Sequence, residues 1–502
     1  MKKYFLILLL IPNCLVAQFR GSNWCFPDSA MIHFDGTNAP TIFSSVIHNT
    51  TDWNPNFTTI GTGVFLEAAA TISSENGNLL CYSNGETIWN KNHEVMLNGN
   101  SLQCDYSTTN GVLILPYPEN DSLYEIIYTN DIDGGLSFSK VNMNLDGGLG
   151  AVIPTEKNIP LISDTLICEK LCAVRHGNGR DWWIVVHNSV NTFYKFLLTP
   201  SGIFSVQSQS IGIPQQNNSL FGISEMLFSK DGSTLGFVNL RFAETFSFNR
   251  CTGQFSNEII LDSVSMQGTW LDYYSGAFSE DGSKFYVSNE KDIFQFDLEN
   301  AIPSSTKTLI WHNHYGDISP LSDSAYSLRQ MELGDNNKIY VTSTYRVGPE
   351  TQMHFGFQNM NLCVINEPDS LGTACNFVKY SQFLGGRRTH FGLPNMPNYN
   401  LSALDESECD SLNLSIEKNF VETKSIVRIF PNPAADELTI EILNGIAPQQ
   451  IEIVNALGQK VLQLHQTKPT ALINIHTLPS GTYFIKVHLQ NGELLIKKFI
   501  KQ

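Results

Sequence analysis

The feature that most constrains this chain is a short unit that recurs along it: an apolar stretch, a turn of the Asp-Gly or Asn-Gly kind, and a second apolar stretch. Clear copies run over residues 72–83, 228–238, 278–288 and 332–342. Asp-Gly between alternating apolar residues is a strong signal for a β-hairpin, because the tight turn needs positive φ at its central residues. Helical periodicity is almost absent between residues 24 and 400, so the chain is expected to be all-β.

The spacing of these units, about 40 to 60 residues, is typical of propeller blades rather than of helical solenoids. More degenerate copies are centred at residues 117–128 and 178–186, and a further blade is expected from residues 355–399, closed by an N-terminal strand near residues 30–34. Radial repetition also removes long exposed sheet edges. We therefore predict a seven-bladed β-propeller over residues 18–400, with two stacked β-sandwiches as the alternative.

The composition changes twice beyond residue 400. Residues 401–425 are rich in Asp and Glu with little alternation, and we expect them to form an exposed acidic linker. Alternation returns over residues 426–502, for example at Leu438, Ile440 and Ile442. Several short strands in so short a segment predict a small Ig-like β-sandwich.

Residues 426–502 carry landmarks that resemble the type A sorting domain of cargo of the type IX secretion system. The landmarks are Pro431-Asn432-Pro433, the Ala-Leu-Gly turn that ends at Gly458, the segment with Gly481 and Tyr483, and the closing Lys497-Lys498-Phe499. The resemblance implies that an outer-membrane translocon reads this domain and that a sortase-like peptidase removes it. It also implies that the mature protein is released or joined to lipopolysaccharide.

Residues 24–399 are similar to uncharacterised propeller domains on surface and adhesin-like proteins of gliding bacteria. The matching segments are 23–24, 87–93, 169–171, 174–176 and 391–394. The Asp-Gly-Ser-Lys-Phe-Tyr-Val unit also resembles propellers of the lactonase and quinoprotein-like type. Neither resemblance brings catalytic residues with it.

The first residues have the order of a secretory signal peptide: basic Lys2 and Lys3, an apolar run over residues 4–11, and small residues before Gln18. Cleavage is expected between Ala17 and Gln18, followed by Sec-dependent passage through the periplasm to the outer-membrane surface or the medium. A membrane anchor is the alternative, but the run falls well short of the roughly 20 apolar residues that a spanning helix needs. No transmembrane span is therefore expected in the mature chain.

The net charge limits the classes of binding partner, and the number of cysteines limits the disulfide bonds that the chain can form. The net charge of -17 argues against a nucleic-acid partner, because phosphate binding needs a basic face. The chain has ten cysteines, and loss of Cys14 with the signal peptide would leave an odd number, so at least one thiol stays free or pairs elsewhere. Cys363 and Cys375 flank a turn-rich loop and are the expected structural disulfide.

Two segments carry the residue types of metal ligands. His312 and His314 are two residues apart, and therefore on one face of a strand, with Asp317 nearby. Asn130–Gly135 offers hard oxygen ligands of the calcium type but lacks the downstream bidentate Glu. Solvated histidines and a plain turn are the ordinary explanations. No cofactor is firmly predicted, and calcium or another divalent ion is the alternative.

A triplet of Asp, then Ser or Thr, then an apolar residue recurs more often than composition predicts. It resembles the O-glycosylation acceptor of bacteria with this secretion system, although Asp-Ser also forms good turns. The acceptor hydroxyls would be those of Ser29, Ser122, Thr165, Ser263, Ser324, Ser370 and Ser411.

Two classes of function fit these observations, and catalytic residues are not assigned because no nucleophile elbow, zinc-protease helix or phosphate loop is present. The first is a non-enzymatic surface module that binds a glycan, a protein or the cell envelope. The second is a hydrolase or lactonase with a metal in the central channel. Convergent Asp, Glu, Asn and His at the channel mouth would favour the enzyme, and an apolar or aromatic rim would favour binding.

Overall fold

The computed structural model describes residues 19–36, 39–47, 66–130, 134–163, 167–214, 223–263, 273–289, 291–312, 324–347, 357–404, 407–409, 426–443, 448–455, 459–465, 468, 470–489 and 494–502. The chain divides into two compact units, Met1–Asn413 and Leu414–Gln502. Across the described ranges the fold is all-β, as predicted, with short 3-10 turns at η1 (Asp146–Gly148), η2 (Pro154–Glu156), η4 (Pro303–Thr306) and η6 (Gly372–Cys375). None of the helical segments in those ranges is long and apolar enough to cross a membrane.

The described part of the first unit forms seven antiparallel sheets, numbered here in chain order. Sheets 1 to 3 contain β1 (Asn23–Phe26), β2 (Ala30–His33), β3 (Thr41–Ser44); β4 (Ala70–Ser73), β5 (Leu79–Ser83), β6 (Ile88–Asn90); and β7 (Val112–Pro116), β8 (Leu123–Thr129), β9 (Leu136–Asn142), β10 (Ala151–Val152), β11 (Ile159–Ile162). Sheets 4 and 5 contain β12 (Ile167–Arg175), β13 (Trp182–Asn188), β14 (Thr192–Thr199), β15 (Gly202–Ser210); and β16 (Met226–Phe228), β17 (Thr234–Asn239), β18 (Phe242–Asn249), β19 (Gln254–Ser263). Sheets 6 and 7 contain β20 (Ser275–Phe278), β21 (Lys284–Ser288), β22 (Asp292–Asp297), β23 (Thr308–His312); and β24 (Ser324–Leu333), β25 (Ile339–Val347), β26 (Asn361–Ile365), β27 (Phe377–Phe383).

The six predicted hairpins are confirmed, each as the first two strands of a sheet: β4–β5, β7–β8, β12–β13, β16–β17, β20–β21 and β24–β25. Their turns use the backbone conformation that the sequence requires, with φ of +82° at Gly77 and +72° at both Gly232 and Gly282. An L side chain rarely adopts such φ values, and glycine does so without steric cost. The hairpins were therefore predictable from local chemistry alone.

The remaining sheet is not the one predicted. Residues 361–383 provide the last two strands of sheet 7, while Ala30–His33 pairs with Asn23–Phe26 and Thr41–Ser44 in sheet 1. Residues 355–399 therefore do not form a blade with the N-terminal strand. The physical reason is that β25 has a free edge of backbone N–H and C=O groups, and the next strands along the chain, β26 and β27, pair with it in turn.

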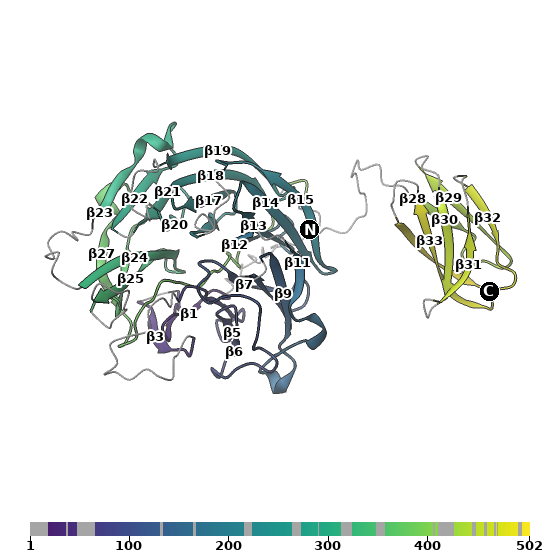
Figure 1. The fold of residues 1–502 in the computed structure, drawn as a ribbon, viewed down its shortest axis with the longest axis horizontal. Helices are drawn as coiled ribbons and strands as arrows, with labels where there is room; N and C mark the ends of the chain where they lie inside the picture. Colours follow the sequence, from purple (N-terminus) through teal and green to yellow (C-terminus); the bar gives the residue numbers. More distant parts are fainter. Residues whose placement is uncertain are drawn as a thin grey trace, which may run out of the picture. The chain divides into compact units, whose positions relative to one another are not determined.

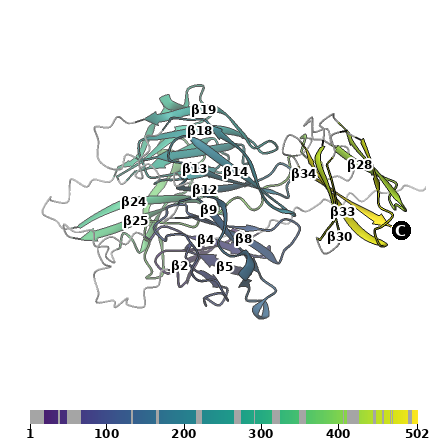
Figure 2. The same cartoon turned by 45° about the vertical axis from the view of Figure 1, so that its right-hand side comes forward.

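The seven sheets follow one another around a ring, with the first strand of each sheet toward the centre (Figure 1). The ring closes between sheets 1 and 7, where the ring centroid of Trp24 lies 5.7 Å from that of Tyr340, and Phe34 lies 5.6 Å from Tyr340. A buried ion pair adds to this closure, since Arg388 contacts the Asp28 carboxylate at 2.8 Å. Sheet 1, near the N-terminus, and sheet 7 are thus neighbours in the ring (Figure 2).

The second unit consists of two antiparallel sheets around one core. One sheet has the order β28 (Ile426–Phe430), β29 (Glu437–Leu443), β32 (Thr470–Asn474), and the other has β31 (Lys460–Leu464), β30 (Pro448–Asn455), β33 (Gly481–Leu489), β34 (Leu494–Lys501). The alternating residues seen in the sequence point inward, with Leu438, Ile440 and Ile485 fully buried. Burial of one face of each sheet explains the period of two in the sequence.

The disulfide prediction was wrong in its partners. Cys251 is bonded to Cys409, and Cys363 and Cys375 are separate buried thiols. The Cys363 sulfur accepts a hydrogen bond from the Tyr380 backbone N–H at 3.4 Å, so that thiol is directed toward β27 rather than toward η6. Proximity in sequence around a loop did not translate into proximity of the two sulfurs.

The predicted linker begins later than residue 401. Arg250 donates to the Ser402 carbonyl at 2.6 Å, and the Leu404 N–H donates to the Gly177 carbonyl at 2.8 Å. Leu401 packs on the core between sheets 4 and 5. Residues 401–404 therefore belong to the first unit, and residues 410–425 lie outside the described part of the chain.

Candidate functional site

Polar residue pairs stand just before or within the first strand of five sheets, and the ring brings them together at its centre. The pairs are Thr109-Asn110, Glu169-Lys170, Ser224-Glu225, Tyr274-Ser275 and Arg329-Gln330, with Glu67 at the corresponding place before β4. Our sequence analysis did not identify them. A polar pair that recurs beside or within an otherwise apolar strand was the signal that could have located them.

The first central cluster surrounds the carboxyl group of Glu225. Its Oε1 accepts from Gln330 Nε2 at 2.8 Å and from Asn110 Nδ2 at 3.3 Å, and its Oε2 accepts from the Gly276 N–H at 3.1 Å and from the Ser275 hydroxyl. Burial raises the pKa of Glu225, and these hydrogen bonds oppose the rise. Both carboxyl oxygens are engaged by protein donors, so this group ties sheets 3, 5, 6 and 7 together.

Residues 389–401 run through the middle of the ring as an extended segment, which we call the central segment. The Leu393 N–H donates to Gln330 Oε1 at 2.5 Å, and Asn395 Nδ2 donates to the carbonyls of Asn110 at 3.2 Å and Leu171 at 2.8 Å. Gly392 passes so close to sheet 2 that a Cβ there would lie 1.7 Å from the Glu67 carbonyl oxygen. The chain itself therefore fills much of the centre.

The second central cluster contains two carboxyl groups that share one hydroxyl. Thr109 Oγ1 lies 2.9 Å from Glu67 Oε2 and 2.9 Å from Glu169 Oε2. A hydroxyl has one proton to donate, so one of the two carboxyls must itself carry a proton and donate to Thr109. Burial, then the charge of Glu169, raises the pKa of Glu67 to about 8. Glu67 is therefore the carboxyl that keeps its proton at neutral pH, beside Glu169.

Arg329 and two aromatic rings border this carboxyl pair. The Arg329 guanidinium lies 4.1 Å from the Phe391 ring centroid and 5.3 Å from that of Tyr274. Arg329 also lowers the pKa of Glu67, although less than burial raises it. An acid, a carboxylate and a cation thus lie within one cluster, which is an arrangement able to donate and accept protons.

A small cavity of about 120 Å³ lies beside the central segment, lined among others by Glu332, Asp335, Lys230 and Asn398. Burial and the charges of Glu225 and Asp335 raise the pKa of Glu332 well above its ordinary value. Asn398 Nδ2 donates to the Lys230 carbonyl at 2.7 Å and holds the segment against sheet 5. The cavity is large enough for a few water molecules rather than for an organic substrate.

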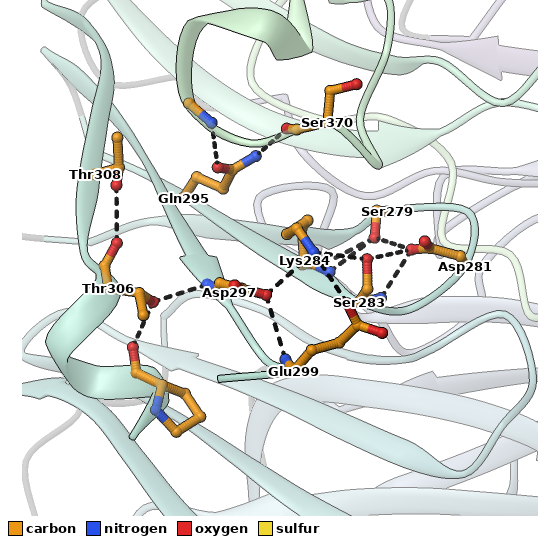
Figure 3. Close-up of polar contacts among 12 residues, drawn as sticks. Ser279, Asp281, Ser283, Lys284, Gln295, Asp297, Glu299, Thr306, Thr308 and Ser370 are labelled. Carbon is orange, nitrogen blue, oxygen red and sulfur yellow. Dashed lines mark hydrogen bonds and ion pairs between the residues drawn. The ribbon is translucent and has the colours of Figure 1, made fainter. Parts of the chain in front are cut away.

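The Asp-Gly turns do not add ligands to the centre. In sheet 6, Asp281 Oδ1 accepts from the Ser279 hydroxyl at 2.8 Å and from the Ser283 N–H at 2.8 Å (Figure 3), and the pKa of Asp281 is lowered to about 2, because these hydrogen bonds outweigh its burial. The Lys284 ammonium contacts Asp297 at 3.1 Å in the same network. These carboxylates are occupied in holding the hairpin, so the repeated Asp is a structural residue of the turn.

The structure describes some of the predicted metal ligands and not others. His312 Nδ1 contacts the Asp292 carboxylate, while His314 and Asp317 lie outside the described residues. In the calcium-like segment, the Asn130 N–H donates to the Gly135 carbonyl at 3.0 Å, and residues 131–133 are outside. Across the described ranges no group of three or more His, Cys, Asp or Glu side chains is arranged to hold a metal ion.

The predicted glycosylation sites differ in exposure. Ser263 is exposed at the end of β19, while Ser29, Ser122 and Ser370 are half-buried, and Ser324 begins β24. Thr165 and Ser411 lie outside the described residues, as do the predicted cleavage residues Ala17 and Gln18. Modification of these sites stays a prediction.

The predicted sorting landmarks of the second unit converge on its last strand. Asn432 Oδ1 accepts from the Ile500 N–H at 2.9 Å, and the Tyr483 ring stacks on Phe499 with centroids 5.5 Å apart. Pro431 and Pro433 flank Asn432 before β29, and Gly481 opens β33. Lys497 and Lys498 are exposed on β34, and Gly458 is outside the described residues.

Comparison with known proteins identifies this second unit. Residues 428–502 match the family described as the secretion system C-terminal sorting domain. Among curated proteins no sequence matches the chain.

The chain is also similar to solved structures, of which three follow. PorZ, a surface component of the type IX secretion system of Porphyromonas gingivalis, is 13% identical, with 95% of this chain and 59% of that chain covered and a TM-score of 0.34. A functionally unknown protein of Desulfotomaculum acetoxidans is 15% identical, covering 75% and 99%, with a TM-score of 0.38. The Swd1 β-propeller domain of Myceliophteria thermophila is 11% identical, covering 62% and 90%, with a TM-score of 0.33.

The chain spans about three fifths of the length of PorZ, and no functional property is transferred from these structures. The match to the sorting-domain family does not depend on these structures, because it covers the second unit from its first strand to the end of the chain. The chain is therefore cargo of the type IX secretion system, delivered to the cell surface or beyond by its C-terminal sorting domain.

Proposed function

We propose that the first unit is a seven-bladed β-propeller that acts as a non-catalytic binding module on the cell surface, and that the second unit is an Ig-like sandwich read by the type IX translocon. A signal peptide at residues 1–17 and later removal of the sorting domain by a sortase-like peptidase complete the proposal. The ligand would be a glycan or a protein, and the exported chain would be released or joined to lipopolysaccharide.

The occupied centre of the ring carries this proposal. A propeller enzyme with a metal in its channel needs an open axis and several unengaged ligands from different blades. Here the central segment lies in the axis, and its Leu393 N–H and Asn395 side chain donate to the surrounding sheets. The convergent carboxyl of Glu225 has four donors on its two oxygens. The central polar groups thus support a structural role, which leaves the outer surfaces for binding.

The test is to display the full chain on the cells that secrete it and to compare adhesion with cells that lack it. Loss of adhesion in the deleted strain, restored when the unaltered chain is expressed again, is the expected result. Equal adhesion of both strains, together with hydrolysis of an ester or lactone by the purified chain, would overturn the proposal.

A second function, a hydrolase, is favoured by one observation: the protonated Glu67 shares the Thr109 hydroxyl with a second carboxyl group, that of Glu169. An acid and a carboxylate in one cluster are the pair that general acid–base hydrolysis uses. A Glu67→Gln variant would abolish such hydrolysis and leave adhesion unchanged. A metal-dependent lactonase would instead lose activity on chelation.

A further inference from the structure

A groove of about 350 Å³ lies between sheets 1 and 2, away from the centre of the ring. In sheet 1 the register pairs Asn23 with His33, and Met31 with Phe43, so these side chains share one face of the sheet. Sheet 2 adds the hairpin residues Gly77 to Leu79, and His93 follows β6. The volume lies at the low end of the roughly 300–1,000 Å³ of small-ligand pockets.

The tautomer of His33 follows from its neighbour Asn23. Asn23 Nδ2 donates to the Gly77 carbonyl at 2.8 Å, and a carbonyl can only accept, so Asn23 must direct its oxygen toward His33. His33 Nδ1, at 3.0 Å from that oxygen, therefore carries the proton. In the neutral ring the Nε2 atom then holds a lone pair. It has no protein partner among the described residues, and it can accept a hydrogen bond from a ligand.

His93 has the opposite tautomer. The Tyr82 hydroxyl oxygen accepts from the Val46 N–H at 3.3 Å and lies 3.0 Å from His93 Nδ1. Burial raises the pKa of Tyr82, so its hydroxyl keeps its proton and donates it to His93 Nδ1. His93 Nε2 then carries the ring proton and can donate. Burial also lowers the pKa of His93, which favours this neutral form.

Apolar surface lies beside these two imidazoles. Phe43 is 49% exposed on β3, although its neighbour Met31 on the same face is buried. No Asp, Glu, Lys or Arg is among the residues that line the groove, and Arg387 donates to the Ser44 hydroxyl at its rim. The groove therefore suits a neutral molecule with both apolar faces and hydroxyl groups.

We propose that the groove between sheets 1 and 2 binds a neutral carbohydrate residue. Phe43 stacks on the apolar face of the sugar ring, His33 accepts a hydrogen bond from one of its hydroxyls, and His93 donates a hydrogen bond to another. A sugar hydroxyl both donates and accepts, which matches the complementary pair of imidazole nitrogens. The inference rests on the proposed function as a binding module and names the ligand class and the site.

The test is affinity electrophoresis of the full chain in native gels that contain a neutral polysaccharide: laminarin, mannan, xylan or starch. Polygalacturonate serves as the charged comparison. At least one neutral polymer is expected to retard the protein. Phe43→Ala is expected to weaken that retardation about tenfold or more, because stacking on the ring is lost.

Phe204→Ala is the matched control, because Phe204 is 50% exposed on β15, far from the groove in sequence and in a different sheet. It should behave as the unaltered chain. His93→Phe, which keeps a planar ring and removes the donor, should weaken retardation as well. Circular dichroism melting of each variant separates loss of binding from loss of fold.

Three outcomes would overturn the inference: retardation by none of the neutral polymers, retardation by polygalacturonate alone, or equal retardation of Phe43→Ala and Phe204→Ala. If adhesion of cells is still lost on deleting the protein, the binding function survives and only this site is wrong. If adhesion is also unchanged, both proposals fail.

Discussion

The disulfide between Cys251 and Cys409 should contribute a large part of the stability of the first unit. The two cysteines are 158 residues apart, and the loop-entropy relation for a loop of that length predicts a stabilisation of about 5 kcal/mol. The bond joins the turn between β18 and β19 to the end of the segment that passes through the ring. Its removal frees the unfolded chain and loosens the contacts of residues 401–409.

The perturbation is the double variant Cys251→Ser/Cys409→Ser, measured by urea unfolding with tryptophan fluorescence. Trp182 and Trp183 lie buried in β13, next to the sheet that carries Cys251, and report on this region. The variant should unfold with a free energy lower by several kcal/mol. Dithiothreitol should lower the stability of the unaltered chain to the same value and leave the variant unchanged.

Equal unfolding midpoints for the variant and the unaltered chain would refute this reasoning. So would a mass shift from alkylation of Cys251 under non-reducing conditions, because a free thiol there means that the bond does not form. Cys363 and Cys375 are buried thiols, and alkylation after unfolding should modify both.

Four further outcomes are expected. Gly392→Ala should destabilise the unit by about 3 kcal/mol in thermal or urea unfolding, because its Cβ would overlap the Glu67 carbonyl oxygen at 1.7 Å. Burial and the charge of Glu169 raise the pKa of Glu67 to about 8 in the folded chain, against 4.5 for the free group, so the stability that protonated Glu67 contributes is full below pH 4.5 and is lost as the pH rises through 8. Glu67→Gln should remove this fall in the free energy of unfolding, which is up to about 1.4 kcal/mol per pH unit and can be measured by unfolding at pH 5 and pH 8. Deletion of residues 427–502 should leave the protein in the periplasm, as followed by fractionation and blotting, and normal surface display would contradict the sorting assignment. Glycosylation should add mass at exposed Ser263, and Ser263→Ala should remove it; an intact mass equal to that of the bare mature chain would end this idea.

The hairpins were predictable because each depends on residues that are neighbours in sequence. Gly282 and the alternating apolar residues around it determine the turn and the strand faces without help from the rest of the chain. The alternation in β29 was equally sufficient to predict a sheet with one buried face. Local conformational preference and side-chain period carried these predictions.

The central clusters were not predictable, because their members are brought together by ring closure. Gln330 and Asn110 are separated by 220 residues, and the Leu66 N–H donates to His390 across 324 residues. The central segment has no regular period, since its backbone bonds go to several different sheets. Nothing in a local window distinguishes such a segment from a surface loop.

The pairing of Cys251 with Cys409 belongs to the same class of long-range fact, and it bears on the proposed removal of the sorting domain. Sheet 1 closes on sheet 7 through Trp24 and Tyr340, and the chain then returns through the ring before it reaches Cys409. Among the described residues, the contacts of the first unit given above all involve residues up to Cys409. Cleavage between residues 410 and 425 therefore breaks none of them, and the disulfide prevents the new C-terminus from pulling the central segment out of the ring.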